Sequence, residues 1–331
     1  MRVGLIGYGY WGPNILRNLI AHTDVQVAIV ADQKLERLAT LKKMYPAMRT
    51  TTDEKDVIEE SDAVIVATPV QTHYPLVRAL LEAGKHVLVE KPLADSLVHA
   101  KELVELAEQK KLTLMVDHTY LYTGAVAAMK KLIDAGEIGT LQSFSSTRFN
   151  LGLFQGDVNV LWDLAPHDLS TLLYLWDHMP TVVNAVGASH TGNGIENTAY
   201  MTLRYDDGLI AHIGASWISP VKIRQMLICG DKKMIVFDDT EVTEKVKVYE
   251  SGYTVRTDED KQRLYADYRV GDIHIPNVGN KEALQGVVED FVRSVSTGST
   301  PLSNARFGLN VVRVLDAAER SLKQGGAEVR L

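Results

Sequence analysis

The stretch from Arg2 to Asp32 limits the possible folds of this chain more than any other part of its 331 residues. An apolar run over residues 2–6 predicts a buried strand, and the loop after it, Gly7-Tyr8-Gly9-Tyr10-Trp11-Gly12, fits the pattern G-x-G-x-x-G. Residues 14–20 have helical spacing, residues 25–30 form a second apolar run, and Asp32 lies 20 residues after Gly12. The predicted order is therefore strand, glycine loop, helix and strand, with an acid at the end of the second strand.

A glycine pattern alone is a weak signal, but in this order it matches the fingerprint of dinucleotide-binding domains. Without side chains, the loop lets a pyrophosphate reach the N–H groups at the start of the helix. Asp32 would accept hydrogen bonds from the adenosine ribose and repel a 2′-phosphate. The stretch therefore predicts an NAD site, with NADP less favoured. The alternative is a nucleotide-free turn in an α/β domain. The loop residues that we expect to bind the cofactor are Gly7, Gly9, Tyr10, Trp11 and Gly12.

The composition is that of an ordinary globular protein, with 46% hydrophobic and 23% charged residues. A formal net charge of -7 at pH 7 argues against a nucleic-acid partner. No apolar run is long enough to span a bilayer, so we expect no membrane partner. The first predicted strand starts at Arg2, which leaves no room for a signal peptide, and the single cysteine, Cys229, fits a reducing compartment. We therefore expect a cytoplasmic protein.

Strands and helices alternate up to about residue 120. Apolar runs over residues 63–67, 86–89 and 112–116 predict further strands, with helices expected over 35–45, 73–83 and 96–110. This alternation predicts a doubly wound parallel sheet of the Rossmann type, whose ligands collect at the carboxyl ends of its strands. His73 and His118 could bind the cofactor or could instead satisfy local main-chain groups. The further cofactor-binding residues that we expect at this edge are Thr68, Pro69, His73, Glu90, Lys91, Pro92 and His118.

Beyond a helix over residues 124–135 the pattern changes to strands joined by hairpin-type turns. Six runs between residues 141 and 237 predict an open, mostly antiparallel sheet with one helix, 164–176, packed on it. Residues 249–280 are expected to be irregular, and two helices, 281–296 and 304–323, end the chain. A sheet face without helices has to be buried elsewhere, so we expect a homodimer or homotetramer formed through this sheet.

These patterns predict two domains and an α/β plus α+β fold class. Residues 1–120 form the predicted NAD(P)-binding Rossmann domain. Residues 121–331 form the predicted α+β domain for substrate binding and oligomerisation, and its C-terminal helix can return to the first domain.

Three motifs occur in the order and spacing of the glucose-fructose oxidoreductase and inositol dehydrogenase (Gfo/Idh/MocA) family. They are the loop 7–12, the triplet Glu90-Lys91-Pro92 and the run Asp163-Leu164-Ala165-Pro166-His167. The chain resembles this family over nearly its whole length. The resemblance implies an NAD(P)-dependent enzyme that oxidises or reduces one carbinol carbon of a sugar, cyclitol or polyol. It further implies that Lys91 touches the substrate hydroxyl and the cofactor, that His167 is the acid/base, and that Asp163 holds the substrate and tunes His167. Ala165 replaces a glycine that is usual in the family.

The chemistry of these residue types agrees with the implied roles. Removing hydride from a C–H bond requires the attached hydroxyl to lose its proton, and an imidazole can accept it near neutral pH. An ammonium beside the oxygen stabilises the developing alkoxide by on the order of 3 kcal/mol in analogous sites. Because Pro166 fits only a first helical turn, we expect Asp163 to be the helix N-cap. The structural alternatives are a surface Lys91 before a turn, a purely capping Asp163, and a His167 that partners Asp168.

The motifs at residues 7–14 and 162–168 resemble the branch of nucleotide-sugar 3-dehydrogenases and ketosugar reductases in polysaccharide biosynthesis. The leading hypothesis is hydride transfer at C3 of a nucleotide-linked sugar such as a UDP-amino sugar, for example by a UDP-N-acetylglucosamine 3-dehydrogenase. By the same analogy the candidates for substrate contact are Arg148, Asn150, Trp162 and Asp163. The alternatives are an inositol or free-sugar dehydrogenase and a non-catalytic NAD(P)-binding sensor. No metal site is expected, because the histidines are scattered and no metal-binding motif occurs.

Overall fold

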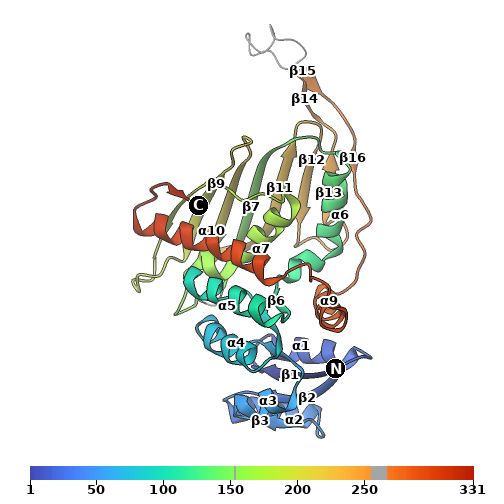
Figure 1. Cartoon of the computed structure of the whole chain (residues 1–331). Coiled ribbons are helices and arrows are strands. Elements are labelled where there is room, and N and C mark those ends of the chain that lie inside the picture. The colour runs from blue at the N-terminus through green and yellow to red at the C-terminus, as the bar shows by residue number, and fades with distance from the viewer. Residues whose placement is uncertain (153, 255–266) are drawn as a thin grey trace. The chain divides into compact units, whose positions relative to one another are not determined.

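The chain folds into two compact units. The computed structural model describes residues 1–152, 154–254 and 267–331 (Figure 1). The first unit comprises residues 1–122 and 281–313, and the second comprises residues 123–280 and 314–331. The first unit thus takes in a late segment of the chain as well as the part that was expected to form the Rossmann domain.

The first unit contains a six-stranded parallel sheet, as the alternating pattern predicted. Its strand order is β3-β2-β1-β4-β5-β6, and every neighbouring pair is parallel. The strands are β1 Arg2–Ile6, β2 Gln26–Ala31, β3 Thr50–Thr51, β4 Ala63–Val66, β5 His86–Glu90 and β6 Leu114–Asp117. The helices are α1 Gly12–Ala21, α2 Leu35–Met44, α3 Glu54–Glu60, α4 His73–Glu82, α5 Leu97–Lys110 and α9 Ala283–Thr297. The order reverses between β1 and β4, which is where doubly wound sheets bind ligands.

Burial on both faces explains why the strands of this sheet read as continuous apolar runs. All four residues of β4 are buried. The side of α1 formed by Ile15, Leu16 and Leu19 packs into the same core as Leu5 of β1 and Phe291 of α9. The late segment 281–313 therefore completes the hydrophobic core of the first unit.

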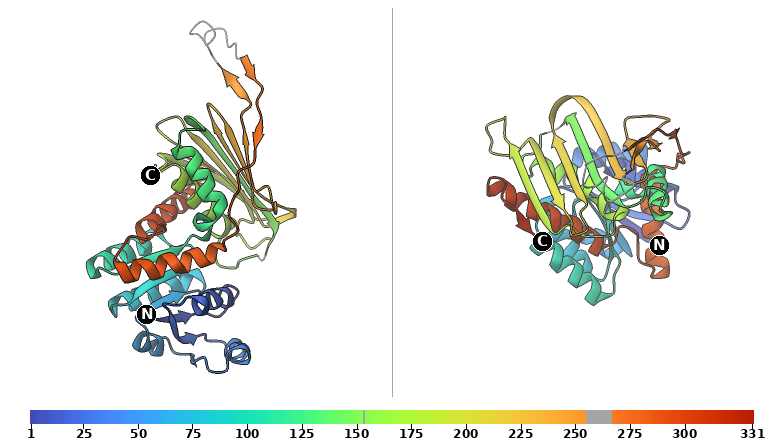
Figure 2. Two further views of the ribbon diagram at one scale, coloured as in Figure 1. Left: turned by 90° about the vertical axis from the view of Figure 1, so that its right-hand side faces the viewer. Right: turned by 90° about the horizontal axis from the view of Figure 1, so that it is seen from above.

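The second unit contains a nine-stranded mixed sheet, which is antiparallel except for the pairing of β7 with β10. The strand order is β16-β13-β12-β11-β7-β10-β9-β8-β17. These strands are β7 Leu141–Leu151, β8 Val182–Ala188, β9 Thr198–Arg204, β10 Ile210–Ser216, β11 Ile218–Gly230, β12 Met234–Asp238, β13 Val246–Tyr249, β16 Ile273–His274 and β17 Val329–Arg330. The helices α6, Gly124–Asp134, and α7, Val160–Leu175, lie on one face of the sheet (Figures 1 and 2). Helix α10, Ala305–Lys323, contributes residues to both units.

The expectation that residues 249–280 are irregular is wrong for the described part of this segment. It contains β16, and β14, Gly252–Thr254, pairs with β15, Asp267–Arg269. The rest of the expected excursion, residues 255–266, lies outside the described residues. Strand β13 was also not expected, because its residues alternate with polar ones too briefly to give a clear signal.

Helix α7 begins one turn earlier than the sequence suggested, so the prediction that Asp163 is the N-cap is wrong. The cap is Asn159, whose side-chain oxygen accepts hydrogen bonds from the N–H groups of Leu161 and Trp162 at 3.1 and 3.3 Å. Pro166 therefore lies inside the helix, where it cannot donate a hydrogen bond to the preceding turn. The helix starts after Asn159 because asparagine is one of the strongest N-cap residues. The position of the proline gave no indication of this cap.

A buried ion pair joins α7 to strand β7. Arg148 Nε donates to Asp168 Oδ2 at 2.8 Å, and a second guanidinium nitrogen donates to Oδ1 at 3.0 Å. The hydroxyl of Ser146 also donates to Oδ1, at 2.7 Å. The two charged side chains are only 3% and 2% exposed. The pair therefore fixes the residue that follows His167 to the central strand of the sheet.

Among residues 1–152, 154–254 and 267–331, we find no helix whose length and hydrophobicity would let it cross a bilayer.

Replacing Arg148 by methionine should lower the free energy of unfolding by roughly 3–5 kcal/mol, because the buried charge of Asp168 then has no cation. The double variant Arg148→Met/Asp168→Asn removes that uncompensated charge and keeps an acceptor for Ser146, so it should recover at least half of the loss. Urea denaturation of both variants measures the difference. Equal losses in the single and double variants would contradict this account of the ion pair.

Candidate functional site

Five strands of the first unit end at the same edge of its sheet, and most predicted cofactor residues follow those ends directly. Gly7 follows β1, Asp32 follows β2, Lys91 follows β5 and His118 follows β6. Thr68 and Pro69 lie two and three residues after β4. Parallel pairing places all these strand ends side by side, so the edge gathers the residues that the sequence predicted to meet there.

The glycine loop has the geometry of a phosphate-binding turn. Gly7 has φ +101°, and a Cβ there would lie 2.2 Å from the carbonyl oxygen of Ala67. A Cβ at Gly12 would lie 2.6 Å from the carbonyl oxygen of Gly7, so the fold itself requires glycine at both positions. At Gly9 the nearest atom would be Nη1 of Arg37, at an ordinary contact distance of 3.5 Å. The fold does not require Gly9, whereas the close approach of a pyrophosphate does.

The loop residues between the glycines are open to a ligand. Tyr10 is 82% exposed and Trp11 is 46% exposed, and their rings meet edge to face with centroids 5.3 Å apart. No side chain among the described residues caps the start of α1. The residues present therefore fit the phosphate groups of a dinucleotide.

Asp32 is buried and is held by three donors of its own chain. It accepts hydrogen bonds from the N–H groups of Tyr8 at 2.7 Å and Lys34 at 2.8 Å, and from Arg37 Nη1 at 3.1 Å. Burial alone would raise the pKa of this carboxyl, but the hydrogen bonds from Lys34, Tyr8 and Arg37 outweigh it, so the pKa lies below its usual range. Asp32 is therefore a fixed negative charge beside Gly9, where an adenosine ribose is expected.

His73 joins two of the strand-end loops. Its Nδ1 lies 2.8 Å from the carbonyl oxygen of Pro92, and its Nε2 lies 2.9 Å from that of Thr68. The side chain is 1% exposed, and burial lowers its pKa. Both ring nitrogens thus satisfy main-chain groups, which is one of the two roles expected from the sequence, while contact with the cofactor stays a prediction. The residue holds the loop of Thr68 and Pro69 against the loop of Lys91 and Pro92.

A cluster of buried ionisable groups surrounds the position of Lys91. Glu90 and Asp117 are register partners at the ends of β5 and β6. His118 is fully buried, and neither of its ring nitrogens has a hydrogen-bond partner among the described residues. Burial, followed by the charge of Lys91, lowers the pKa of His118 to about 3. A buried imidazole without hydrogen bonds lowers the free energy of unfolding. His118 is therefore a candidate for a functional residue.

In the second unit, Asp163 and His167 lie four residues apart inside α7 and therefore share a helix face. Both side chains are half-buried. Nε1 of Trp217 donates to Asp163 Oδ2 at 3.0 Å. The main-chain carbonyl of His167 accepts hydrogen bonds from the hydroxyls of Ser170 and Thr171. The structure thus holds the carboxylate of Asp163 in a fixed position on the face that also carries His167.

The three other candidates for substrate contact differ in their surroundings. Arg148 is buried in an ion pair with Asp168. Trp162 is 4% exposed, and its indole N–H donates to Glu319 at 2.6 Å. For both residues the predicted contact with substrate stays a prediction. Asn150 is half-buried near the end of β7 and keeps its candidate role.

Three residues around these positions were missed by the sequence analysis. Asp117 gives no signal, because its pairing with Glu90 depends on the register of two strands. Trp217 lies far from Asp163 in the sequence, and Arg37 is one of many helix-surface cations until the fold places it on Asp32. Each of the three can be recognised only from a contact with a residue that is distant in the sequence.

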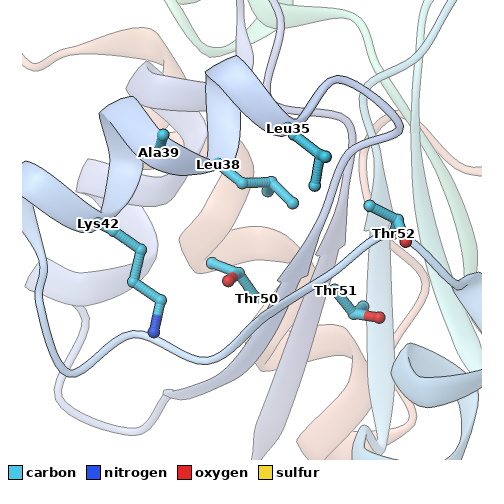
Figure 3. A pocket seen from close by; sticks show the side chains of 7 residues that line it. All are labelled: Leu35, Leu38, Ala39, Lys42, Thr50, Thr51 and Thr52. Atoms are coloured by element: carbon cyan, nitrogen blue, oxygen red, sulfur yellow. The ribbon is translucent and has the colours of Figure 1, made fainter.

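A surface pocket of about 450 Å³ lies apart from these residues, between α2 and β3 (Figure 3). It holds none of the predicted site residues. Its lining side chains are Leu35, Leu38, Ala39, Lys42, Thr50, Thr51 and Thr52.

Comparison with known proteins agrees with this geometry. Residues 1–118 match a family described as an oxidoreductase family with an NAD-binding Rossmann fold, and residues 126–236 match the GFO/IDH/MocA C-terminal domain. The UDP-N-acetylglucosamine 3-dehydrogenase of Acidithiobacillus ferrooxidans is 31% identical over 69% of this chain and 71% of its own. The myo-inositol 2-dehydrogenase of Thermotoga maritima is 24% identical over 98% of this chain and 97% of its own.

A solved structure of the Acidithiobacillus ferrooxidans enzyme GnnA superposes on this chain with a TM-score of 0.82. The alignment covers 98% of both chains at 24% identity. At 24% identity, this structural similarity is evidence for a shared fold alone.

Replacing His118 by leucine should make the protein more resistant to acid. An unfolded histidine titrates near 6.5, whereas the folded pKa is about 3. Between these values the unfolded state binds the additional proton, so the wild type loses stability as the pH falls, by about 2 kcal/mol at pH 5. Melting temperatures at about pH 5 and pH 8 measure the effect. A difference between variant and wild type that is the same at both pH values would contradict a buried neutral His118.

Proposed function

Since this chain belongs to the Gfo/Idh/MocA oxidoreductase family, we propose that it transfers a hydride between NAD and a ring carbinol carbon of a nucleotide-linked sugar. The proposed position is C3 and the proposed substrate class is a UDP-amino sugar. The observation that carries this proposal is the 31% identity to a UDP-N-acetylglucosamine 3-dehydrogenase over 69% of the chain. The first unit is an NAD-binding Rossmann domain, and the fit of Gly9 and Asp32 to a dinucleotide supports the cofactor.

The proposed chemistry assigns one task to each of three residues. In the oxidising direction, bound NAD would supply the acceptor for the hydride that leaves the carbinol carbon. His167 takes the proton of the attached hydroxyl, because a neutral imidazole can act as a base near neutral pH. Lys91 places its ammonium beside the same oxygen and stabilises the negative charge that develops there. The products are a ketosugar, NADH and a proton held by the imidazole, so atoms and charge balance.

Asp163 is proposed to hold the substrate through its hydroxyl groups. Its Oδ2 accepts the indole N–H of Trp217, which orients a carboxylate whose oxygens can accept hydrogen bonds from sugar hydroxyls. Lys91 belongs to the first unit, and Asp163 and His167 belong to the second. The joint action of the three on one substrate is part of the proposal.

A second candidate function is the oxidation of a free cyclitol or sugar. The 24% identity to a myo-inositol 2-dehydrogenase over 98% of the chain favours it. A non-catalytic sensor is a third possibility, but a sensor has no need for Lys91, Asp163 and His167 together.

The test is a panel of UDP-sugars, free inositols and free hexoses with NAD, read by NADH absorbance. We expect turnover with at least one UDP-amino sugar. Lys91→Met and His167→Gln should each reduce kcat by about 100-fold or more while NADH binding stays within about threefold, because each removes an interaction made in the transition state. Asp62→Asn, a change at an exposed pair with Arg2, is the matched control and should leave kcat unchanged.

Clear turnover of inositols with no activity on any nucleotide sugar would reverse the ranking of the two substrates. A Lys91→Met enzyme with the wild-type kcat would contradict the proposed mechanism.

We also propose that the open face of the second sheet pairs with the same face of another copy of the chain. The side chains of β8, β9 and β10 that face away from the buried side include Val186, Tyr200 and Ile210, which are 41–52% exposed. The ring of Tyr200 contacts Phe149 of β7 and stacks on His212 of β10. Exposed apolar and aromatic side chains on one sheet face are typical of an interface between subunits.

Light scattering of the wild type should give a dimer or tetramer, and Tyr200→Glu with Ile210→Glu should shift the mass toward the monomer, because both introduce like charges on a self-complementary face. The control is Lys43→Glu, a charge reversal on the exposed side of α2 in the first unit. A wild type that is monomeric at micromolar concentration would overturn this assembly.

A further inference from the structure

Two carboxyl groups that the proposed mechanism does not use lie together in the first unit. Glu90 is the last residue of β5 and Asp117 is the last residue of β6, and the two are register partners on neighbouring parallel strands. Side chains of such partners point to the same face of the sheet. Glu90 is 9% exposed and Asp117 is 2% exposed. The fold therefore places two carboxyls next to each other, away from water.

The local hydrogen bonds do not compensate two negative charges. The N–H of Lys91 donates to Glu90 Oε2 at a long 3.3 Å, and the hydroxyl of Thr119 donates to Asp117 Oδ1 at 2.6 Å. Burial, followed by the neighbouring charge of Asp117, raises the pKa of Glu90 well above its usual range. Burial raises the pKa of Asp117 to about 6. Two adjacent buried carboxyls of this kind do not both ionise near neutral pH.

The other ionisable group that acts on the pair is Lys91, and His118, His73 and Asp95 are linked to the same cluster. The charge of Lys91 acts on both carboxyls and on both histidines. Burial keeps both histidines neutral near pH 7, since it lowers the pKa of each. Lys91 thus brings one ammonium to the two carboxyls of the pair. The pair carries one negative charge toward Lys91 when its two carboxyls together hold one proton.

We propose that Glu90 and Asp117 share one proton at neutral pH and that their remaining negative charge positions the ammonium group of Lys91 at the carboxyl end of β5. Both are positioning residues, since they act through Lys91. The proposal rests on the proposed function in one respect, namely that Lys91 acts on the substrate. The sharing of the proton stands independently of that function.

Amide variants of the same shape test the pair. Glu90→Gln and Asp117→Asn each leave one carboxyl, which ionises beside Lys91 and keeps one negative charge there. We expect each single variant to retain kcat within about fivefold. Glu90→Gln/Asp117→Asn removes the negative charge of the pair beside Lys91 and should lose about 100-fold in kcat, far more than the product of the single effects. NADH affinity, measured for all three variants, separates an effect on cofactor binding from this loss in kcat, and Asp62→Asn is again the control for the loss of a distant carboxylate.

Infrared difference spectroscopy supplies a readout that needs no substrate. The wild type at about pH 7.5 should show the carbonyl stretch of a protonated carboxyl, and both single variants should lack it. Absence of this band in the wild type would overturn the shared proton, even if sugar turnover is normal. If no sugar is turned over, the proposed function fails, while the band still decides whether the proton is shared. A double variant with wild-type kcat, or single variants as impaired as the double, would overturn the positioning role.

Discussion

The parallel pairing of β4, β5 and β6 is the constraint on which the chemistry of the first unit depends. Their registers place the last residues of the strands side by side, and the loops that follow carry Thr68, Lys91 and His118. A shift of one residue in the register would turn the side chains of a strand to the opposite face. Both faces of these strands are packed against the core, so a shifted strand would have to repack its side chains on both faces. Packing of the core thus determines which polar groups meet at the edge.

Buried charges in this protein fall into two kinds. The charge of Asp168 is matched by Arg148, and that of Asp32 by three donors, so both are stable structural features. Within the described part of the chain, Glu90 and Asp117 lack equivalent donors. Since a buried carboxyl without compensation destabilises the folded state, its presence at the edge of the sheet requires another reason. Proximity to Lys91 provides that reason.

The sequence was sufficient to predict features that depend on local pattern. The order of strands and helices, the Rossmann fold and the family all follow from periodicity and short motifs, and they are confirmed by the sheet topology and the family match. The features that it could not predict depend on contacts between distant residues. The start of α7 was misplaced because Asn159 caps it, and the buried ion pair of Arg148 with Asp168 could not be seen in the sequence. Asp117 was missed for the same reason.

The surroundings of Asp32 suggest how the site distinguishes NAD from NADP. A carboxylate offers about four lone-pair directions, and three are occupied by Tyr8, Lys34 and Arg37. One direction therefore remains for a ribose hydroxyl, so discrimination rests on the negative charge more than on the number of hydrogen bonds. Arg37 partly offsets that charge, and its side chain is 40% exposed beside Gly9. The expected preference for NAD thus depends on a fixed carboxylate whose charge is partly offset by an exposed guanidinium. Since the Arg37 side chain is partly exposed, a substitution at this position changes that offset with little effect on the core.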